Sequence, residues 1–445
     1  MSVWEKYSKN QQEKYIKYLQ VFGSLTNLFR QKATNSIPYL DSKYQETIFA
    51  KSFDAKNVDF GNTPHDILSI FGKKRVGIGL KTWMGSEPSF QKVMQLKRFK
   101  NEIALHAKKQ EDLAYKISEI RNERVSRDYK RLGLSKENNI YHYVTRDKGS
   151  FTINECAYPL IDLNNLNNFN FNSDKKILLW SDGYKDYKYT FSDSQIWQRF
   201  DANKYKTLLL KKFNVAIIED PFSILLEIFG DRSYKPSNVD RDKIEVYLPL
   251  YSFNDQQVQK KSGLNAWNAA PKTKNSSNPR PLHEVYIPIP REFHKKHPDF
   301  FTENIFEFEK EQKNFSGDKK DKPEIRFYLN LPNGKRIPSL VTQSSMKALQ
   351  SGSNTEYDEN GKLYGQSALG KWLLLDVLGL GKRELVTLDW LHKRGTDCVR
   401  IWRKKDDYKD FYIDFAPIDA FESFIKNKVI VQSEQESQAN FNPTL

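Results

Sequence analysis

The chain has 445 residues, of which 38% are hydrophobic and 13% aromatic, which excludes a disordered protein and leaves room for two or three domains. Its formal net charge of +15 predicts attraction to a polyanion, although a merely soluble basic protein has the same balance. Its two cysteines, Cys156 and Cys398, form no zinc pair and suit a reducing compartment. No apolar run reaches the ~20 residues of a membrane span, and the apolar core of a secretory signal is missing. We therefore expect a cytoplasmic protein with no membrane partner.

The N-terminal region is predicted to begin with helices and to continue as strands. Apolar residues recur at helical spacing through residues 3–30. Residues 37–83 read as strands, and the clearest of them form a hairpin over 64–83, where two apolar runs flank Gly72 and Lys73. The position of this turn determines which residues face each other across the two strands.

Two charged residues lie on one face of this hairpin, close to its open end. Asp66 faces Gly79 on the second strand, and Lys81 is the next residue on the same face. A carboxylate that holds a metal, beside a lysine that neutralises developing negative charge, is the layout of a magnesium-dependent phosphodiesterase. A surface ion pair is the alternative interpretation of the same two residues.

Helices and strands follow before a charged linker. Residues 89–131 are predicted to be mainly helical, and residues 139–200 to be mostly strands with a short helix at 194–200. Another short helix is expected over 222–229. The segment 230–242 contains proline and many charges, so it is predicted to link two domains.

The second half has the pattern of short strands with proline at their ends. A strand is predicted at Ile244–Leu250, and Pro249, Pro288 and Pro290 lie at strand ends, as in a barrel of short strands. The polar loop 256–274 combines Gln, Lys, Asn and Trp. These residue types contact the base edges and sugars of DNA, so the loop is a candidate DNA-binding segment.

The hairpin of the first half resembles the signature of the PD-(D/E)xK nucleases. Pro64-His65-Asp66, followed by Lys81 at the end of an apolar strand, is similar to that motif. The resemblance implies that Asp66 and Lys81 are catalytic. Members of the family have a second acid two residues before the lysine, where this chain has Gly79. In some members this acid lies instead on the following helix, at the position that Gln95 occupies in this chain. The second metal ligand therefore stays open between Asp54, the best substitute, Gln95, and the weaker candidates Glu46, Glu87 and Glu102.

The second half carries several motifs in a recognisable order. Lys261–Ala269, Glu284–Pro290, Phe327–Leu331 and Leu369–Leu373 lie within Glu245–Phe415. Together they resemble the DNA-reading domain of bacterial type II restriction endonucleases. That domain is a pseudobarrel related to the plant B-three transcription-factor domain.

This second resemblance implies two loop arms that grip the major groove of DNA. The first arm is the loop 256–274, and the second lies within 343–371. Trp372 belongs to an apolar helix and is predicted to pack in the core, whereas Trp267 fits either core packing or a DNA contact. The expected DNA-binding residues are Lys261, Asn265, Trp267, Asn268, Lys272, Gln343, Ser344 and Lys347.

The predicted fold is α+β, with a PD-(D/E)xK-like nuclease core and a β-rich extension in 1–235, a mainly-β, B-three-like pseudobarrel in 240–430, and a disordered tail in 431–445. The predicted function is that of a type II restriction endonuclease, which hydrolyses double-stranded DNA with Mg²⁺ held by Asp66 and Asp54. It implies a cognate DNA methyltransferase as a genetic partner and allows a homodimer. A DNA-binding protein without catalysis is the alternative. An RNA-binding protein fits less well, because the sequence has no RNP-like strand and no KH-type loop.

Overall fold

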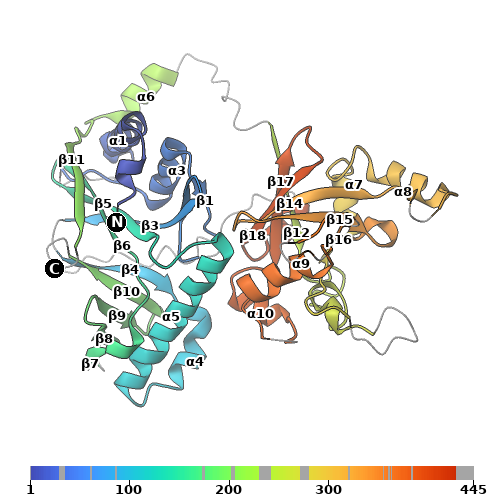
Figure 1. Ribbon diagram of the computed structural model, residues 1–445. Coiled ribbons are helices and arrows are strands. Elements are labelled where there is room, and N and C mark those ends of the chain that lie inside the picture. Colours follow the sequence, from blue (N-terminus) through green and yellow to red (C-terminus); the bar gives the residue numbers. More distant parts are fainter. Residues whose placement is uncertain are drawn as a thin grey trace. The chain divides into compact units, whose positions relative to one another are not determined.

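The computed structural model of the chain contains both helices and sheets, so the α+β class is confirmed (Figure 1). The chain divides into two compact units, Met1–Ser237 and Asn238–Leu445. Among the described residues, no helix is long and apolar enough to cross a membrane. The described residues are 2–29, 36–60, 63–85, 88–172, 176–201, 206–229, 242–270, 280–318, 321–353, 355–358, 361, 363–381 and 384–426. Glu87, Lys272, residues 230–241 of the predicted linker and the tail 431–445 lie outside them.

A six-stranded sheet forms the centre of the first unit, in the order β1-β2-β3-β5-β6-β11. β3 and β5 are parallel, and the other neighbouring strands are antiparallel. A crossover that contains α5 (Gln110–Leu132) joins the parallel pair, because parallel strands cannot be joined by a tight turn. The strands are β1 (Lys56–Asn57), β2 (Ile67–Phe71), β3 (Lys74–Met84), β5 (Asn139–Asp147), β6 (Ser150–Ala157) and β11 (Leu208–Asn214).

Both faces of this sheet are covered. On one face, α1 (Lys9–Ser24) and α3 (Ser42–Phe53) pack their apolar side chains against those of β3 and β5 (Figure 1). On the other face, α5 and a second, antiparallel sheet in the order β4-β10-β9-β8-β7 enclose a core rich in tyrosine and tryptophan. The strands of the second sheet are β4 (Ser89–Gln95), β7 (Asn167–Asn172), β8 (Ile177–Ser181), β9 (Asp186–Thr190) and β10 (Gln195–Phe200). The shorter helices are α2 (Thr26–Phe29), α4 (Lys100–Ala104) and α6 (Pro221–Phe229).

The predicted hairpin is confirmed with its register. Phe71 pairs with Lys74, so the turn consists of Gly72 and Lys73. Gly72 has a φ of 59°, a conformation that glycine adopts without steric cost. The helices predicted over 3–30 and 222–229 are also confirmed.

Other predicted elements are wrong. Residues 42–53 form helix α3 instead of a strand, and its N-terminus is capped by Asp41, which accepts a hydrogen bond from the Tyr44 N–H at 3.0 Å. Residues 90–95 and 195–200, which were predicted to be helical, form β4 and β10. These strands pair with each other and bury one face in the core, so tertiary pairing overrides the helical pattern.

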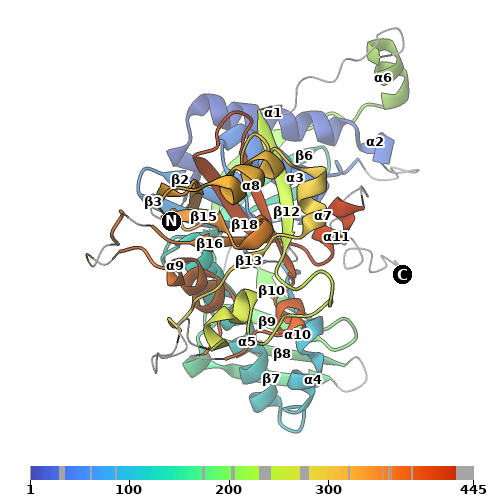
Figure 2. The ribbon, with the colours of Figure 1, turned by 90° about the vertical axis from the view of Figure 1, so that its right-hand side faces the viewer.

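A seven-stranded sheet forms the second unit, in the order β12-β17-β18-β14-β15-β16-β13. Only β14 and β18 are parallel neighbours. The end strands β12 and β13 also contact each other, so the sheet curls, and Figure 2 shows β15, β16 and β13 side by side. The strands are β12 (Lys243–Pro249), β13 (Ile287–Pro288), β14 (Ile325–Asn330), β15 (Arg336–Thr342), β16 (Ala348–Ser351), β17 (Cys398–Lys404) and β18 (Asp410–Ala416). The helices are η4 (Gly263–Asn268), α7 (Arg291–Lys296), α8 (Ile305–Asn314), α9 (Ser367–Gly370), η7 (Lys371–Val377), α10 (Leu388–Lys393) and α11 (Ala420–Ile425).

Candidate functional site

The open end of the β2–β3 hairpin carries Asp66 and Lys81. The N–H of Asp66 donates to the carbonyl of Ile78 at 3.0 Å, and its carboxylate accepts a hydrogen bond from the Leu80 N–H at 2.6 Å. The first bond extends the strand pairing, and the second holds the carboxylate across the strand pair. Burial raises the pKa of Asp66, and the nearby ammonium of Lys81 acts in the opposite direction. The structure therefore brings the two charged groups together, and both side chains are half-buried.

Helix α3 supplies a second carboxylate, Glu46. Burial, together with repulsion from Asp66, raises the pKa of Glu46 to about 7. Lys43, on the same helix, places its Nζ 3.0 Å from Glu46 Oε2 and 3.3 Å from Asp59 Oδ2. Asp59 lies in the loop between β1 and β2. Three carboxylates and two lysines thus gather beside the end of the hairpin, and we call these five residues the acidic site.

A buried network clamps the loop between β1 and β2 to helix α5. Asp128 Oδ2 lies 2.7 Å from His65 Nδ1 and accepts the His65 N–H at 3.1 Å. Arg131 pairs with Asp128 at 2.7 Å and donates to the carbonyl of Val58 at 3.0 Å. Burial opposes ionisation of Asp128, but Arg131 and His65 together lower its pKa below the usual value. The loop that carries two of the acids is therefore held rigidly from the interior.

Two tyrosine rings fill the space beside Gly79. A Cβ added at Gly79 would lie 2.9 Å from the Tyr141 ring and 3.1 Å from the Tyr158 ring. The rings stack with centroids 4.0 Å apart, and the Tyr158 hydroxyl donates to the carbonyl of Pro64 at 3.0 Å. An acid at position 79 would have to push these rings aside. A second carboxylate ligand for a metal would therefore have to come from another element, and Glu46 on α3 is the candidate.

Asp54 and Gln95, the two ligands expected beside Asp66, lie away from the acidic site. Asp54 is the exposed C-cap of α3 and lies eight residues beyond Glu46, about 12 Å along the helix. Gln95 ends β4 in the second sheet, where its Nε2 donates to a backbone carbonyl at 2.6 Å. The slot assigned to Gln95 requires a helix that is not formed there. Of the weaker candidates, Glu102 pairs with Lys116 at 2.9 Å on α4 and α5.

Asp66 and Glu46 are the candidate ligands of a Mg²⁺ ion whose other coordination positions are filled by water or by a substrate phosphate. Within the described ranges, no group of three or more His, Cys, Asp or Glu side chains is arranged to hold a metal by itself. Mg²⁺, however, is commonly bound through one or two carboxylates together with water and a phosphate. Asp66 and Glu46 are two such carboxylates, and their mutual repulsion is relieved when a cation lies between them.

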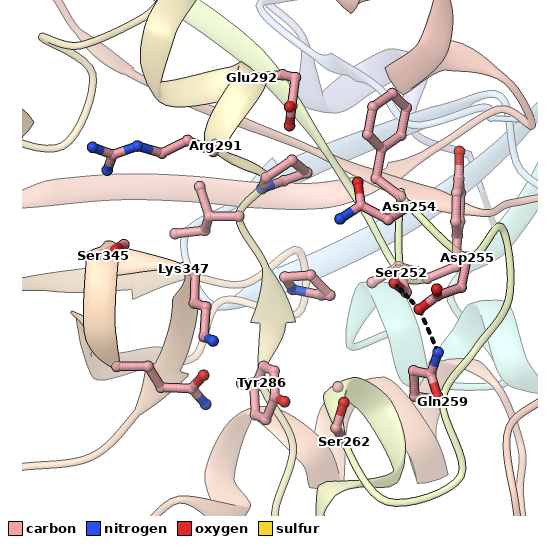
Figure 3. Close-up of a pocket in the computed structure, with 18 of the residues that line it drawn as sticks. Ser252, Asn254, Asp255, Gln259, Ser262, Tyr286, Arg291, Glu292, Ser345 and Lys347 are labelled. Atoms are coloured by element: carbon pink, nitrogen blue, oxygen red, sulfur yellow. Dashed lines mark hydrogen bonds between the residues drawn. The ribbon is translucent and has the colours of Figure 1, made fainter.

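The second unit contains a groove of about 720 Å³ between two loops (Figure 3). Residues 250–264 form one wall, residues 343–347 form the other, and residues 286–292 form the floor. The first wall overlaps the first expected DNA-gripping arm, 256–274, and the second wall lies within the second expected arm, 343–371. Lys347 is exposed, and its ammonium points into the groove. Among the residues that the structure describes, Lys347 makes no ion pair, whereas Arg291 and Lys313 both pair with Glu309.

The expected DNA-binding residues differ in exposure. Asn265 is fully buried, and its amide makes three hydrogen bonds to the backbone of Gln259 and Val386, so it shapes the loop and is not free to read a base. Trp267 is only 5% exposed and packs in the core. Asn268 is half-buried and donates to the carbonyl of Lys260. The exposed members are Lys261, Gln343, Ser344 and Lys347.

Both walls of the groove contain unusual backbone conformations. Gln343, Ser345 and Met346 have φ values of 68°, 61° and 51°, and Gln256 in the opposite wall has a φ of 51°. Positive φ values are uncommon for residues other than glycine, and they cluster at binding and active sites, where the surrounding fold maintains the strain. The groove is therefore built by two strained loops on a rigid sheet.

No protein-family model matches this sequence, and no curated protein matches it. The two sites differ in chemistry. The acidic site presents three carboxylates beside two lysines, and the groove presents polar side chains from two loops.

Proposed function

We propose that this chain is a magnesium-dependent endonuclease that hydrolyses double-stranded DNA at specific sequences. The observation that carries the proposal is the convergence of Asp66, Glu46 and Lys81 at the end of one hairpin. The sheet with one parallel crossover supports a PD-(D/E)xK-like core in the first unit. The curled seven-stranded sheet supports a B-three-like pseudobarrel in the second. The net charge of +15 favours a polyanionic substrate.

The residues of the acidic site have distinct roles in this mechanism. Asp66 and Glu46 would hold Mg²⁺, and the bound ion would supply positive charge to the scissile phosphate and a lower pKa to a bound water molecule. Lys81 donates a hydrogen bond to the non-bridging oxygen that gains charge as water attacks phosphorus in line with the leaving oxygen. The clamp formed by Asp128, His65 and Arg131 keeps the acid-bearing loop in position before substrate arrives.

Digestion of supercoiled plasmid with the full chain tests the proposal directly. We expect nicked or linear DNA when Mg²⁺ is present, no cleavage in EDTA, and ends that map by sequencing to one recurring sequence. Cleavage at random sequences would contradict the specificity. Specific binding in a gel-shift assay without any cleavage would support the alternative, a non-catalytic DNA-binding protein, which the glycine at position 79 favours.

Lys347 is expected to contribute to DNA binding from the centre of the groove. A lysine that reads a base edge contributes ~1–3 kcal/mol, so Lys347→Ala should weaken binding to the cleaved sequence about ten- to a hundredfold. Fluorescence anisotropy with a labelled duplex measures this change. Lys313→Ala is the matched control, because Lys313 lines the same groove but already pairs with Glu309. Equal effects of the two variants would exclude a specific contact by Lys347.

A further inference from the structure

Lys43 occupies the centre of the acidic site. Its Nζ lies 3.0 Å from Glu46 Oε2 and 3.3 Å from Asp59 Oδ2, and Asp66 also acts on it electrostatically. The exposures differ sharply: the side chain of Lys43 is 56% exposed, whereas those of Glu46 and Asp59 are 8% and 14% exposed. The acids are therefore fixed in the protein, while the ammonium has a free path to solvent.

The ammonium and a divalent cation compete for the same oxygen atoms. Glu46 Oε2 accepts the hydrogen bond from Lys43, and the charge of Asp66 repels the same carboxylate. A cation that binds between Glu46 and Asp66 must detach Lys43 or share Glu46 with it, and sharing places two positive charges side by side. The lysine side chain can leave, because its four-carbon stem is flexible and its head group is strongly hydrated.

The geometry points to Lys43 as a displaceable internal counter-ion that competes with the divalent cation for Glu46. This inference rests on the proposed function, because it assumes that the acidic site binds Mg²⁺. Lys43 neutralises the acids when no metal is bound. It lowers the affinity of the site for Mg²⁺, because its ion pairs must break before the metal binds. Metal binding moves Lys43 into solvent.

Titration of the full chain with MgCl₂ by isothermal calorimetry, without DNA, tests this role. At about pH 8.5, where protons compete less for Glu46, we expect Lys43→Gln to bind Mg²⁺ roughly three- to tenfold more tightly than the original chain, the change that ion pairs of ordinary strength produce. Lys51→Gln is the matched control, because it removes the same charge from α3 two turns away. Lys43→Arg keeps the competing charge and is expected to retain the original affinity.

The possible outcomes separate the inference from the proposed function. Equal affinities of Lys43→Gln and the original chain would overturn the role of Lys43 and leave the metal site intact. An equal gain in Mg²⁺ affinity in Lys51→Gln would also overturn the role of Lys43, since the loss of any positive charge on α3 would then explain the gain. Failure of the original chain and of Lys43→Gln to bind Mg²⁺ or Mn²⁺ would contradict the metal site itself. Thermal melting of each variant verifies that it is folded.

Discussion

Lys81→Ala is expected to slow DNA cleavage by ~10²–10³-fold or more while specific DNA binding is retained. This is the usual loss when a group that stabilises transition-state charge is removed. The variant leaves Asp66 with its hydrogen bond to the Leu80 N–H, so this proposed metal ligand is expected to stay in position. Single-turnover cleavage of a labelled duplex measures the rate, and a gel shift on the same duplex measures binding.

Lys73→Ala provides the control for this variant. Lys73 is exposed in the turn of the same hairpin, at the opposite end from Asp66. Along β3, Lys81 lies eight residues from it, about 26 Å away, so Lys73 is out of reach of the same phosphate. Cleavage by Lys81→Ala at the rate of Lys73→Ala would remove Lys81 from the mechanism.

Glu46→Gln is expected to reduce cleavage by at least ~10²-fold, because the proposed metal site loses one of its two carboxylate ligands and with it most of the charge stabilisation that Mg²⁺ would supply. The amide keeps the shape of the side chain and removes the repulsion with Asp66, so the variant should melt at the temperature of the original chain or above it. Cleavage rates titrated against Mg²⁺ and Mn²⁺, together with thermal melts, check both parts.

Asp54→Asn and Gln95→Glu are the matched controls for Glu46→Gln. Both positions lie outside the acidic site, so both variants are expected to cleave normally, with unchanged metal dependence. A strong effect of Asp54→Asn together with a silent Glu46→Gln would restore Asp54 as the ligand and contradict the site described here. Altered metal preference in Gln95→Glu would place position 95 near the metal.

The hairpin and its register could be predicted because they depend on local chemistry. A two-residue turn with glycine determines the pairing, and the pairing determines that Asp66 faces Gly79. The sequence also contained a signal for α3 that was missed: Asp41 precedes the helix as an N-cap, and Ile48 and Phe49 begin its apolar face. Recognition of this helix would have raised Glu46 above Asp54, since the two lie two turns apart.

Other features depended on contacts distant in the chain. β4 and β10 are separated by about a hundred residues, and the local pattern of each, taken alone, predicts a helix. Their strand character comes from their pairing and from burial in the second core. In the same way, the sequence predicts that the polar loop residue Asn265 contacts DNA. Its amide instead makes hydrogen bonds to the backbone of Val386, which is far along the chain. Propensity cannot reveal such long-range partners.

The tyrosine stack over Gly79 has a consequence for the evolution of this chain. A single substitution to an acid at position 79 would meet the Tyr141 ring at 2.9 Å, and overpacking of this kind typically destabilises a protein by ~1–3 kcal/mol. Replacement of Tyr141 or Tyr158 alone by a smaller residue would instead leave a cavity and remove the stacking between the two rings. Each single change is therefore expected to cost stability by itself, so the glycine is retained by its packing. A second carboxylate for the proposed metal site has to come from an element other than β3.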